Sequence, residues 1–127
     1  MSIKLIAIDI DGTLVDKEFK ITPEVKAAIT EAREQGVKIV LCTGRPFPGV
    51  KRYIKELDLD QDEDYVITYN GSLVLSTATN EVLVSHTLDY SDFVRINELA
   101  DKFNVHTHGI DNEAIYTANK DISIFTT

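Results

Sequence analysis

Nearly unbroken apolar runs in the first half of the chain alternate with segments that carry apolar residues at helical spacing. The runs span 3–8 and 37–41, and a third stretch with the composition of a strand spans 65–68. Such runs are typical of strands buried on both faces of a parallel sheet. Helices are expected between them, over 23–35 and 48–57. This order of elements predicts an α/β fold with a parallel sheet and crossover helices.

Local signals support the first of these helices. Thr22 is a suitable N-cap, and Pro23 fits the first helical position because its missing N–H is not needed there. Gly36 is placed to end the helix. The apolar stripe of this helix consists of Val25, Ala28, Ile29 and Ala32. In the second helix, the residues expected to face inward are Val50, Ile54 and Leu57.

The second half of the chain follows a different pattern. Residues 72–77 and 81–87 are rich in β-branched side chains and flank Ala78-Thr79-Asn80, so they predict a hairpin. A helix is expected over 92–103, with Ser91 as its N-cap. Its apolar face comprises Phe93, Ile96, Leu99, Ala100 and Phe103. Short strands are expected at 105–108, 114–117 and 122–125. The second half therefore indicates an α+β arrangement.

Composition narrows the class of protein. The chain has 127 residues, 43% of them apolar, which suits one domain with a hydrophobic core. Its 13 Lys and Arg against 21 Asp and Glu give a net charge of −8, which argues against nucleic acid as a partner. No apolar run approaches the ~20 residues of a membrane span, and the first residues lead us to expect no export signal. The one cysteine, Cys42, fits the reducing cytoplasm, where we expect the protein to act.

Two carboxylates follow the first predicted strand. Asp9 and Asp11 flank Ile10, and Gly12 and Thr13 permit a sharp turn after them. Ligands bind at this edge of open parallel sheets. Adjacent carboxylates repel one another unless a cation neutralises them, and a hard, oxygen-bound cation such as Mg²⁺ does so. Beside such a cation, Asp9 could attack phosphorus and Asp11 could act as general acid and base.

A second polar element follows the second predicted strand. Thr43 lies at the same sheet edge as Asp9, and its hydroxyl could bind a phosphate oxygen together with the Gly44 N–H. The alternative for Thr43 is a cap or turn role. For Arg45, two roles stay open: it approaches the substrate, or it forms an ion pair with a loop carboxylate.

Two other polar clusters are weaker candidates. The acidic run over 58–64 does not fit an EF-hand calcium loop, since the position that requires glycine falls on Glu63 or Tyr65. A solvated loop between helix and strand explains it better. His106 and His108 could contact substrate or a metal, but two ligands alone are a weak metal signal, and ordinary surface positions explain them better.

The two main motifs resemble those of a known family. Asp9-Ile10-Asp11-Gly12-Thr13-Leu14 and Val40-Leu41-Cys42-Thr43-Gly44-Arg45 are similar to motifs one and two of the haloacid dehalogenase (HAD) superfamily. Residues 67–72, Ile-Thr-Tyr-Asn-Gly-Ser, are similar to a signature of its Cof-type branch. Further stretches, such as Thr-Gly-Arg-Pro and Tyr-Thr-Ala-Asn-Lys-Asp-Ile-Ser, look close to bacterial sugar phosphatases of that branch.

The resemblance implies a fold and a reaction. The fold would be an α/β, Rossmann-like parallel-sheet core over 1–82, incomplete here, followed by the first part of an inserted α+β cap over 83–127. The reaction would be Mg²⁺-dependent hydrolysis of small sugar phosphates through an aspartyl-phosphate. The partner would be a small phosphorylated metabolite.

The resemblance also implies roles for particular residues. Asp9 would be the nucleophile and a Mg²⁺ ligand, and Asp11 would be the general acid/base with its backbone carbonyl on the metal. Phosphate would be bound by the Ile10 N–H, Thr43 and Gly44. The residues at the mouth between core and cap would be Arg45 and Asn70.

The chain departs from the family in its later part. The family carries a phosphate-clamping lysine and a Gly-Asp segment that completes the Mg²⁺ shell, and neither is found in a matching context here. We therefore expect this chain to be an N-terminal piece that is nearly inactive alone. The alternative is a non-catalytic phosphate- or Mg²⁺-binding module, or a fragment that forms a homodimer through its first strand, which becomes a sheet edge. A receiver domain is disfavoured because Thr68 stands where its phospho-acceptor Asp is needed.

Overall fold

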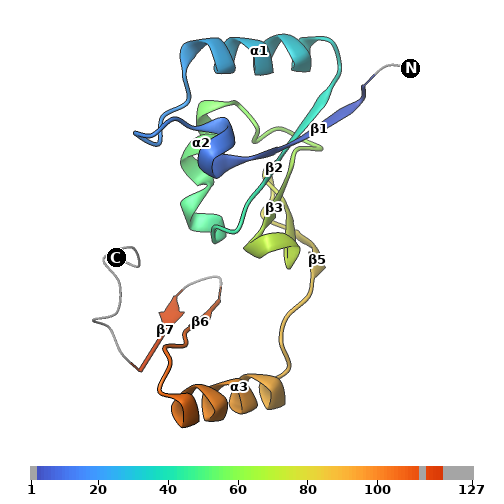
Figure 1. Ribbon diagram of the computed structural model, residues 1–127. Coiled ribbons are helices and arrows are strands. Elements are labelled where there is room, and N and C mark those ends of the chain that lie inside the picture. The colour runs from blue at the N-terminus through green and yellow to red at the C-terminus, as the bar shows by residue number, and fades with distance from the viewer. Residues whose placement is uncertain (1–2, 112–113, 119–127) are drawn as a thin grey trace. The chain divides into compact units, whose positions relative to one another are not determined.

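A computed structural model describes residues 3–111 and 114–118. The chain divides into two compact units, Met1–His86 and Thr87–Thr127, which are here called unit 1 and unit 2 (Figure 1). The expected division into a core over 1–82 and a cap over 83–127 stays a prediction. No helix in the described ranges is long and apolar enough to cross a membrane.

Unit 1 is built on a five-stranded sheet in which β1 to β5 are neighbours in chain order. The strands are β1 (Leu5–Asp9), β2 (Lys38–Cys42), β3 (Tyr65–Thr68), β4 (Leu73–Ser76) and β5 (Val82–Ser85). The first three strands are parallel to one another, while β4 and β5 form the predicted antiparallel hairpin. The predicted α/β class is confirmed, and the parallel register brings the carboxyl ends of β1, β2 and β3 to one edge of the sheet.

Helix α1 (Pro23–Glu34) begins where the sequence predicts and ends one residue before the predicted end at 35. The Thr22 side chain accepts a hydrogen bond from the Val25 N–H at 3.4 Å, so Thr22 is the N-cap. Gly36 has a φ of 81°. In this left-handed conformation, the N–H groups of Gly36 and Val37 reach back to the carbonyls of Arg33 and Ala32, which closes the helix as a Schellman motif.

The second predicted helix is divided into a 3₁₀ turn, η2 (Phe47–Gly49), and helix α2 (Lys51–Glu56). The three residues expected to face inward, Val50, Ile54 and Leu57, are all buried. They join a continuous core with strand residues such as Leu41 and Val66. This core supports the sheet edge at which the predicted site residues lie.

Strand β1 is less buried than its apolar sequence suggests. It lies at one edge of the sheet, and Ile3 and Leu5 are 69% and 56% exposed. The expectation that this run is buried on both faces is therefore wrong, because β2 is its one strand neighbour in the described sheet. The expectation that the first strand becomes an apolar edge is confirmed.

Unit 2 contains helix α3 (Tyr90–Phe103) and a two-stranded sheet of β6 (Gly109–Ile110) and β7 (Ile115–Tyr116). The predicted helix and the strand within 114–117 are confirmed. Ser91 is not the N-cap, because the helix begins earlier and Asp89 takes that position. The strand predicted at 105–108 is also wrong, because pairing with β7 starts at Gly109. The strand predicted at 122–125 lies outside the described residues.

Candidate functional site

The first part of the site is the turn that follows β1. Asp9 is the last residue of β1 and pairs in register with Cys42, the last residue of β2. Beyond it, the turn Ile10–Leu14 closes with a hydrogen bond from the Val15 N–H to the Ile10 carbonyl at 3.2 Å. Gly12 has a φ of 78°, a conformation that residues with a Cβ rarely adopt. The turn can therefore reverse the chain directly after the two carboxylates.

The loops that follow β2 and β3 are joined by backbone hydrogen bonds. The Thr43 N–H donates to the Ile67 carbonyl at 3.0 Å, and the Asn70 N–H donates to the Thr43 carbonyl at 3.1 Å. A third bond runs from the Tyr69 N–H to the Arg45 carbonyl at 3.3 Å. These bonds hold the predicted site residues of the two loops in a fixed arrangement.

In the loop after β2, specific contacts explain why a threonine stands at 43 and a glycine at 44. Thr43 is buried, and its Oγ1 accepts a hydrogen bond from the Arg45 N–H at 3.1 Å. The hydroxyl hydrogen of Thr43 stays available to donate. A Cβ placed on Gly44 would lie 2.8 Å from Oδ1 of Asn70. Gly44 is thus required for a close approach to Asn70, a reason that its sequence neighbours do not reveal.

Two adjacent residues in the loop after β3 have an unfavourable backbone conformation. Tyr69 and Asn70 have φ values of 51° and 56°, in the left-handed region. Asparagine tolerates this conformation, whereas a tyrosine there is unusual. Strained residues of this kind cluster at functional sites, where surrounding contacts hold them in place.

Arg45 forms an ion pair with Asp11. Its Nε donates to Asp11 Oδ2 at 2.8 Å and its Nη2 donates to Asp11 Oδ1 at 2.5 Å, a two-pronged geometry of high specificity. These hydrogen bonds are the main cause that lowers the pKa of Asp11, and they raise the pKa of Arg45. Of the two roles open for Arg45, the structure shows the ion pair.

Asp9 is in a different environment from Asp11. Its side chain is exposed, and its carboxylate has no hydrogen-bond or ion-pair partner among the residues that the structure describes. Burial of Cys42 is the main cause that raises the pKa of its thiol, and the charge of Asp9 raises it further. A raised pKa disfavours the reactive thiolate. One carboxylate of the pair is thus neutralised by a protein cation and the other is left available.

The donor set at this edge suits a hard cation. Asp9 offers carboxylate oxygens and Asp11 offers a backbone carbonyl, the oxygen ligands that Mg²⁺ prefers. Across the described ranges, no three or more His, Cys, Asp or Glu side chains gather into a metal cluster. Mg²⁺ commonly takes one or two protein carboxylates and keeps several waters, so the donors named above could hold such an ion.

Arg45 also contacts two aromatic rings that the sequence alone does not relate to the site. Its guanidinium carbon lies 5.7 Å from the centre of the Phe19 ring and 5.6 Å from that of Tyr53. Phe19 lies in the loop before α1, and Tyr53 lies on α2. Neither residue belongs to a motif, and no periodic signal in the sequence relates them to the site.

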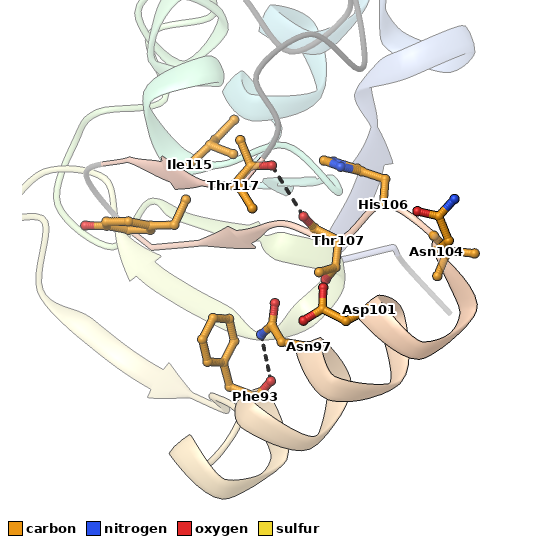
Figure 2. Close-up of a pocket in the computed structure, with 11 residues that line it drawn as sticks. Phe93, Asn97, Asp101, Asn104, His106, Thr107, Ile115 and Thr117 are labelled. Atoms are coloured by element: carbon orange, nitrogen blue, oxygen red, sulfur yellow. Dashed lines mark hydrogen bonds between the residues drawn. The ribbon is translucent and has the colours of Figure 1, made fainter.

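Unit 2 contains a hollow of about 670 Å³ that is lined by α3, by residues 104–107 and by residues 115–118, which include β7 (Figure 2). Figure 2 shows the Asn97 amide donating to the Phe93 carbonyl at 2.8 Å and the Thr117 hydroxyl donating to the Thr107 carbonyl at 3.4 Å. His106 lines this hollow, and its Nε2 lies 3.2 Å from Nδ1 of His108. A substrate or metal contact by these histidines stays a prediction.

The site geometry agrees with a family match over nearly the whole chain. Residues 6–126 match the family described as haloacid dehalogenase-like hydrolase. The chain belongs to this family. It is 50% identical over 123 residues to the Bacillus subtilis protein named "Putative phosphatase YxeH", and the match covers 97% of this chain and 46% of that protein.

Solved structures of HAD-like proteins share the fold. One is a haloacid dehalogenase-like hydrolase from Bacteroides thetaiotaomicron, with a TM-score of 0.81 and 26% identity over 94% of this chain and 45% of that chain. Another is described as the HAD subclass IIB sugar phosphatase BT4131, with a TM-score of 0.72 and 26% identity over 88% of this chain and 42% of that chain. The chain spans about half the length of the relatives that it matches.

Proposed function

We propose that this chain carries part of the active site of a phosphatase that hydrolyses small phosphate monoesters, with Asp9 as nucleophile. The observation that carries the proposal is the contrast between the two carboxylates at the end of β1. Asp11 is paired with Arg45, whereas Asp9 is exposed and has no partner in the described part of the chain. When two neighbouring carboxylates lie in different environments, they can take different roles in catalysis.

In the proposed reaction, the substrate phosphate lies between the ends of β1 and β2. The Ile10 and Gly44 N–H groups and the Thr43 hydroxyl donate hydrogen bonds to its oxygens. Asp9 attacks phosphorus in line, the bond to the alcohol oxygen breaks, and an aspartyl-phosphate forms. Asn70 and Arg45 border the mouth through which the alcohol leaves.

Asp11 serves the two proton transfers. As an acid it donates a proton to the leaving alcohol, and as a carboxylate it then takes a proton from the water that hydrolyses the aspartyl-phosphate. The ion pair with Arg45 favours the carboxylate form, which suits the second transfer and opposes the first, so the pair must open before Asp11 can act as the acid. When bound by Asp9 and the Asp11 carbonyl, Mg²⁺ would offset the charge of the phosphate dianion.

The substrate class that we propose is a sugar phosphate or a similar small phosphorylated metabolite. The likeness to a structure described as a sugar phosphatase supports this choice. A net charge of −8 disfavours nucleic acid as a partner, and a single cysteine suits a reducing cytoplasm.

We propose that the 127-residue chain alone has very low turnover. The phosphate-clamping lysine of the family and the Gly-Asp segment that completes its Mg²⁺ shell are not found in a matching context here, so the electrostatic stabilisation that they supply is expected to be missing. Loss of such electrostatic stabilisation typically lowers kcat by ~10²–10³-fold. The test is hydrolysis of p-nitrophenyl phosphate with Mg²⁺ by the chain and by its Asp9→Asn variant, with Asp62→Asn as a surface control.

The expected result is slow, Mg²⁺-dependent hydrolysis that Asp9→Asn abolishes and Asp62→Asn leaves unchanged. Hydrolysis that survives Asp9→Asn would show that Asp9 is not the nucleophile. Fast hydrolysis that Asp9→Asn abolishes would contradict the low turnover and keep the phosphatase assignment.

A second candidate function is homodimer formation through β1. It is supported by the position of β1 at the sheet edge and by the exposure of Ile3 and Leu5. If β1 pairs, Leu5→Lys will convert a dimer to a monomer in sedimentation, whereas Val82→Lys on β5 will not. A monomeric chain at all accessible concentrations would rule this candidate out.

A further inference from the structure

The loop between β1 and α1 is folded around the Asp16 side chain. Asp16 Oδ1 accepts hydrogen bonds from the N–H groups of Glu18 at 2.8 Å and Lys20 at 2.9 Å. Its backbone closes the same turn, since the Asp16 N–H donates to the Lys20 carbonyl at 2.9 Å and the Phe19 N–H donates to the Asp16 carbonyl at 3.0 Å. This dense bonding gives Phe19 a defined position although the loop is on the surface.

Phe19 itself is in an unfavourable backbone conformation. Its φ is 60°, a value that bulky residues rarely adopt. Its carbonyl accepts hydrogen bonds from Arg52 Nη2 at 3.2 Å and from the Tyr53 hydroxyl at 3.4 Å, so α2 holds the strained residue in place. Glycine would satisfy this turn without strain. A strained phenylalanine therefore points to a use for the ring.

The ring of Phe19 and the ring of Tyr53 both contact the Arg45 guanidinium. The distances from the guanidinium carbon to the ring centres are 5.7 Å and 5.6 Å, within the range of cation–π attraction. Tyr53 is fully buried in the core, whereas Phe19 is 54% exposed. Arg45 thus has one fixed aromatic neighbour and one that the Asp16 turn supplies.

We propose that Phe19 and Tyr53 are positioning residues, which hold the Arg45 guanidinium in the orientation that binds Asp11 with two hydrogen bonds. The role in catalysis rests on the proposed function, but the geometry does not. An arginine side chain has several rotatable bonds, and without lateral contacts it would adopt many orientations at this edge. Held on Asp11, it leaves the Asp9 carboxylate without a protein cation.

The experiment follows the Arg45 Nε–H signal in ¹H–¹⁵N NMR spectra of the 127-residue chain, assigned by its loss in Arg45→Lys. Phe19→Leu removes the ring and keeps an apolar side chain, and Phe19→Trp restores an aromatic face. Phe103→Leu is the matched control, since Phe103 is an exposed phenylalanine whose ring lies 5.7 Å from the Lys102 ammonium in unit 2.

The expected result is a separate, slowly exchanging Arg45 Nε–H signal that is lost in Phe19→Leu, restored in Phe19→Trp and unchanged in Phe103→Leu. Phe19→Gly should also lose this signal while the Glu18 and Lys20 amides keep their positions, because glycine favours the turn. An Arg45 signal that persists in Phe19→Leu would overturn the proposal, whatever Phe19→Gly does.

The same samples separate this proposal from the proposed function. Mg²⁺ and inorganic phosphate, added to the unsubstituted chain, should shift the Thr43 and Gly44 amides if the phosphate site is correct. If those shifts are absent and Phe19→Leu still releases Arg45, the positioning role stands and the proposed function fails. If the shifts occur and the Arg45 signal is unchanged in Phe19→Leu, the positioning role is wrong and the proposed function stands.

Discussion

Units 1 and 2 each contain an amphipathic helix, but the two helices differ in how far their apolar faces are buried. In α1, Ile29 is buried and Val25 and Ala32 pack against the core of unit 1, while Ala28 is exposed. In α3, Ala100 is buried, whereas Phe93 and Leu99 on the same face are exposed. Helical periodicity thus predicts the helix in both units, whereas the extent of its burial depends on the sheet that packs against it.

The largest expected effect compares the same substitution in the two units. Leu41→Ala should destabilise unit 1 by about 3 kcal/mol, because Leu41 is 1% exposed and its removal leaves a cavity. Leu99→Ala in α3 should cost about 1 kcal/mol or less, because Leu99 is 45% exposed. Urea unfolding followed by NMR signals from each unit measures both, and equal losses would contradict the contrast.

The next effect concerns an ion pair in unit 1 that lies at the start of β3. Asp64 is buried and accepts hydrogen bonds from Arg33 Nη2 at 3.2 Å and from the Gln61 N–H at 3.1 Å. Asp64→Ala should cost about 2 kcal/mol, because it leaves these donors without their charged partner. Glu18→Ala, which breaks the exposed pair with Lys20, should change the free energy of unfolding by about 0.5 kcal/mol or less. Similar losses of unfolding free energy in both variants would show that burial does not determine how much an ion pair stabilises the fold.

A smaller effect compares the N-termini of the two helices. Thr22 caps α1 with its side chain, whereas Asp89 at the start of α3 makes no capping hydrogen bond through its side chain. Thr22→Ala should cost about 1 kcal/mol and Asp89→Ala about half as much or less, measured by urea unfolding. A larger loss for Asp89→Ala would mean that its charge beside the helix dipole outweighs a direct cap.

The smallest expected effect is the pH dependence of the Arg45–Asp11 pair. The folded-state pKa of Asp11 is lowered below 3.8 by the hydrogen bonds from Arg45, so the pair stabilises the fold above that pH. The stabilisation is lost as the pH falls through the lowered pKa. Arg45→Met should therefore reduce the free energy of unfolding at neutral pH by less than about 1 kcal/mol, and not at all in strong acid. A loss that is equal at both pH values would instead reflect packing of the Arg45 stem.

Much of the fold could be predicted because its signals are local. The cap at Thr22, the glycine at Gly36 and the apolar runs of β2 and β3 each specify their element through neighbours in the sequence. Burial of β1 could not be predicted in this way, because it depends on which strands flank it. The N-cap of α3 was also misplaced, since Ser91 and Asp89 are both acceptable cap residues.

The sequence could predict which residues form the site better than it could predict how they contact one another. The motifs gave the sheet edge at which Asp9, Thr43 and Asn70 lie. They left the partner of Arg45 open, because residues 11 and 45 come together only through the parallel register of β1 and β2. Phe19 and Tyr53 carried no signal, since an aromatic in a loop and one in a helix core are common for other reasons.

The most direct test of the phosphate site is a map of where phosphate binds on the chain. ¹H–¹⁵N NMR spectra are recorded with Mg²⁺ and increasing inorganic phosphate, for the unsubstituted chain and for Asp9→Asn. The account predicts that the largest shifts fall on amides at the carboxyl ends of β1 and β2, including Ile10, Thr43 and Gly44, and that Asp9→Asn removes their Mg²⁺ dependence. Shifts centred on the hollow of unit 2, or none at all, would contradict it.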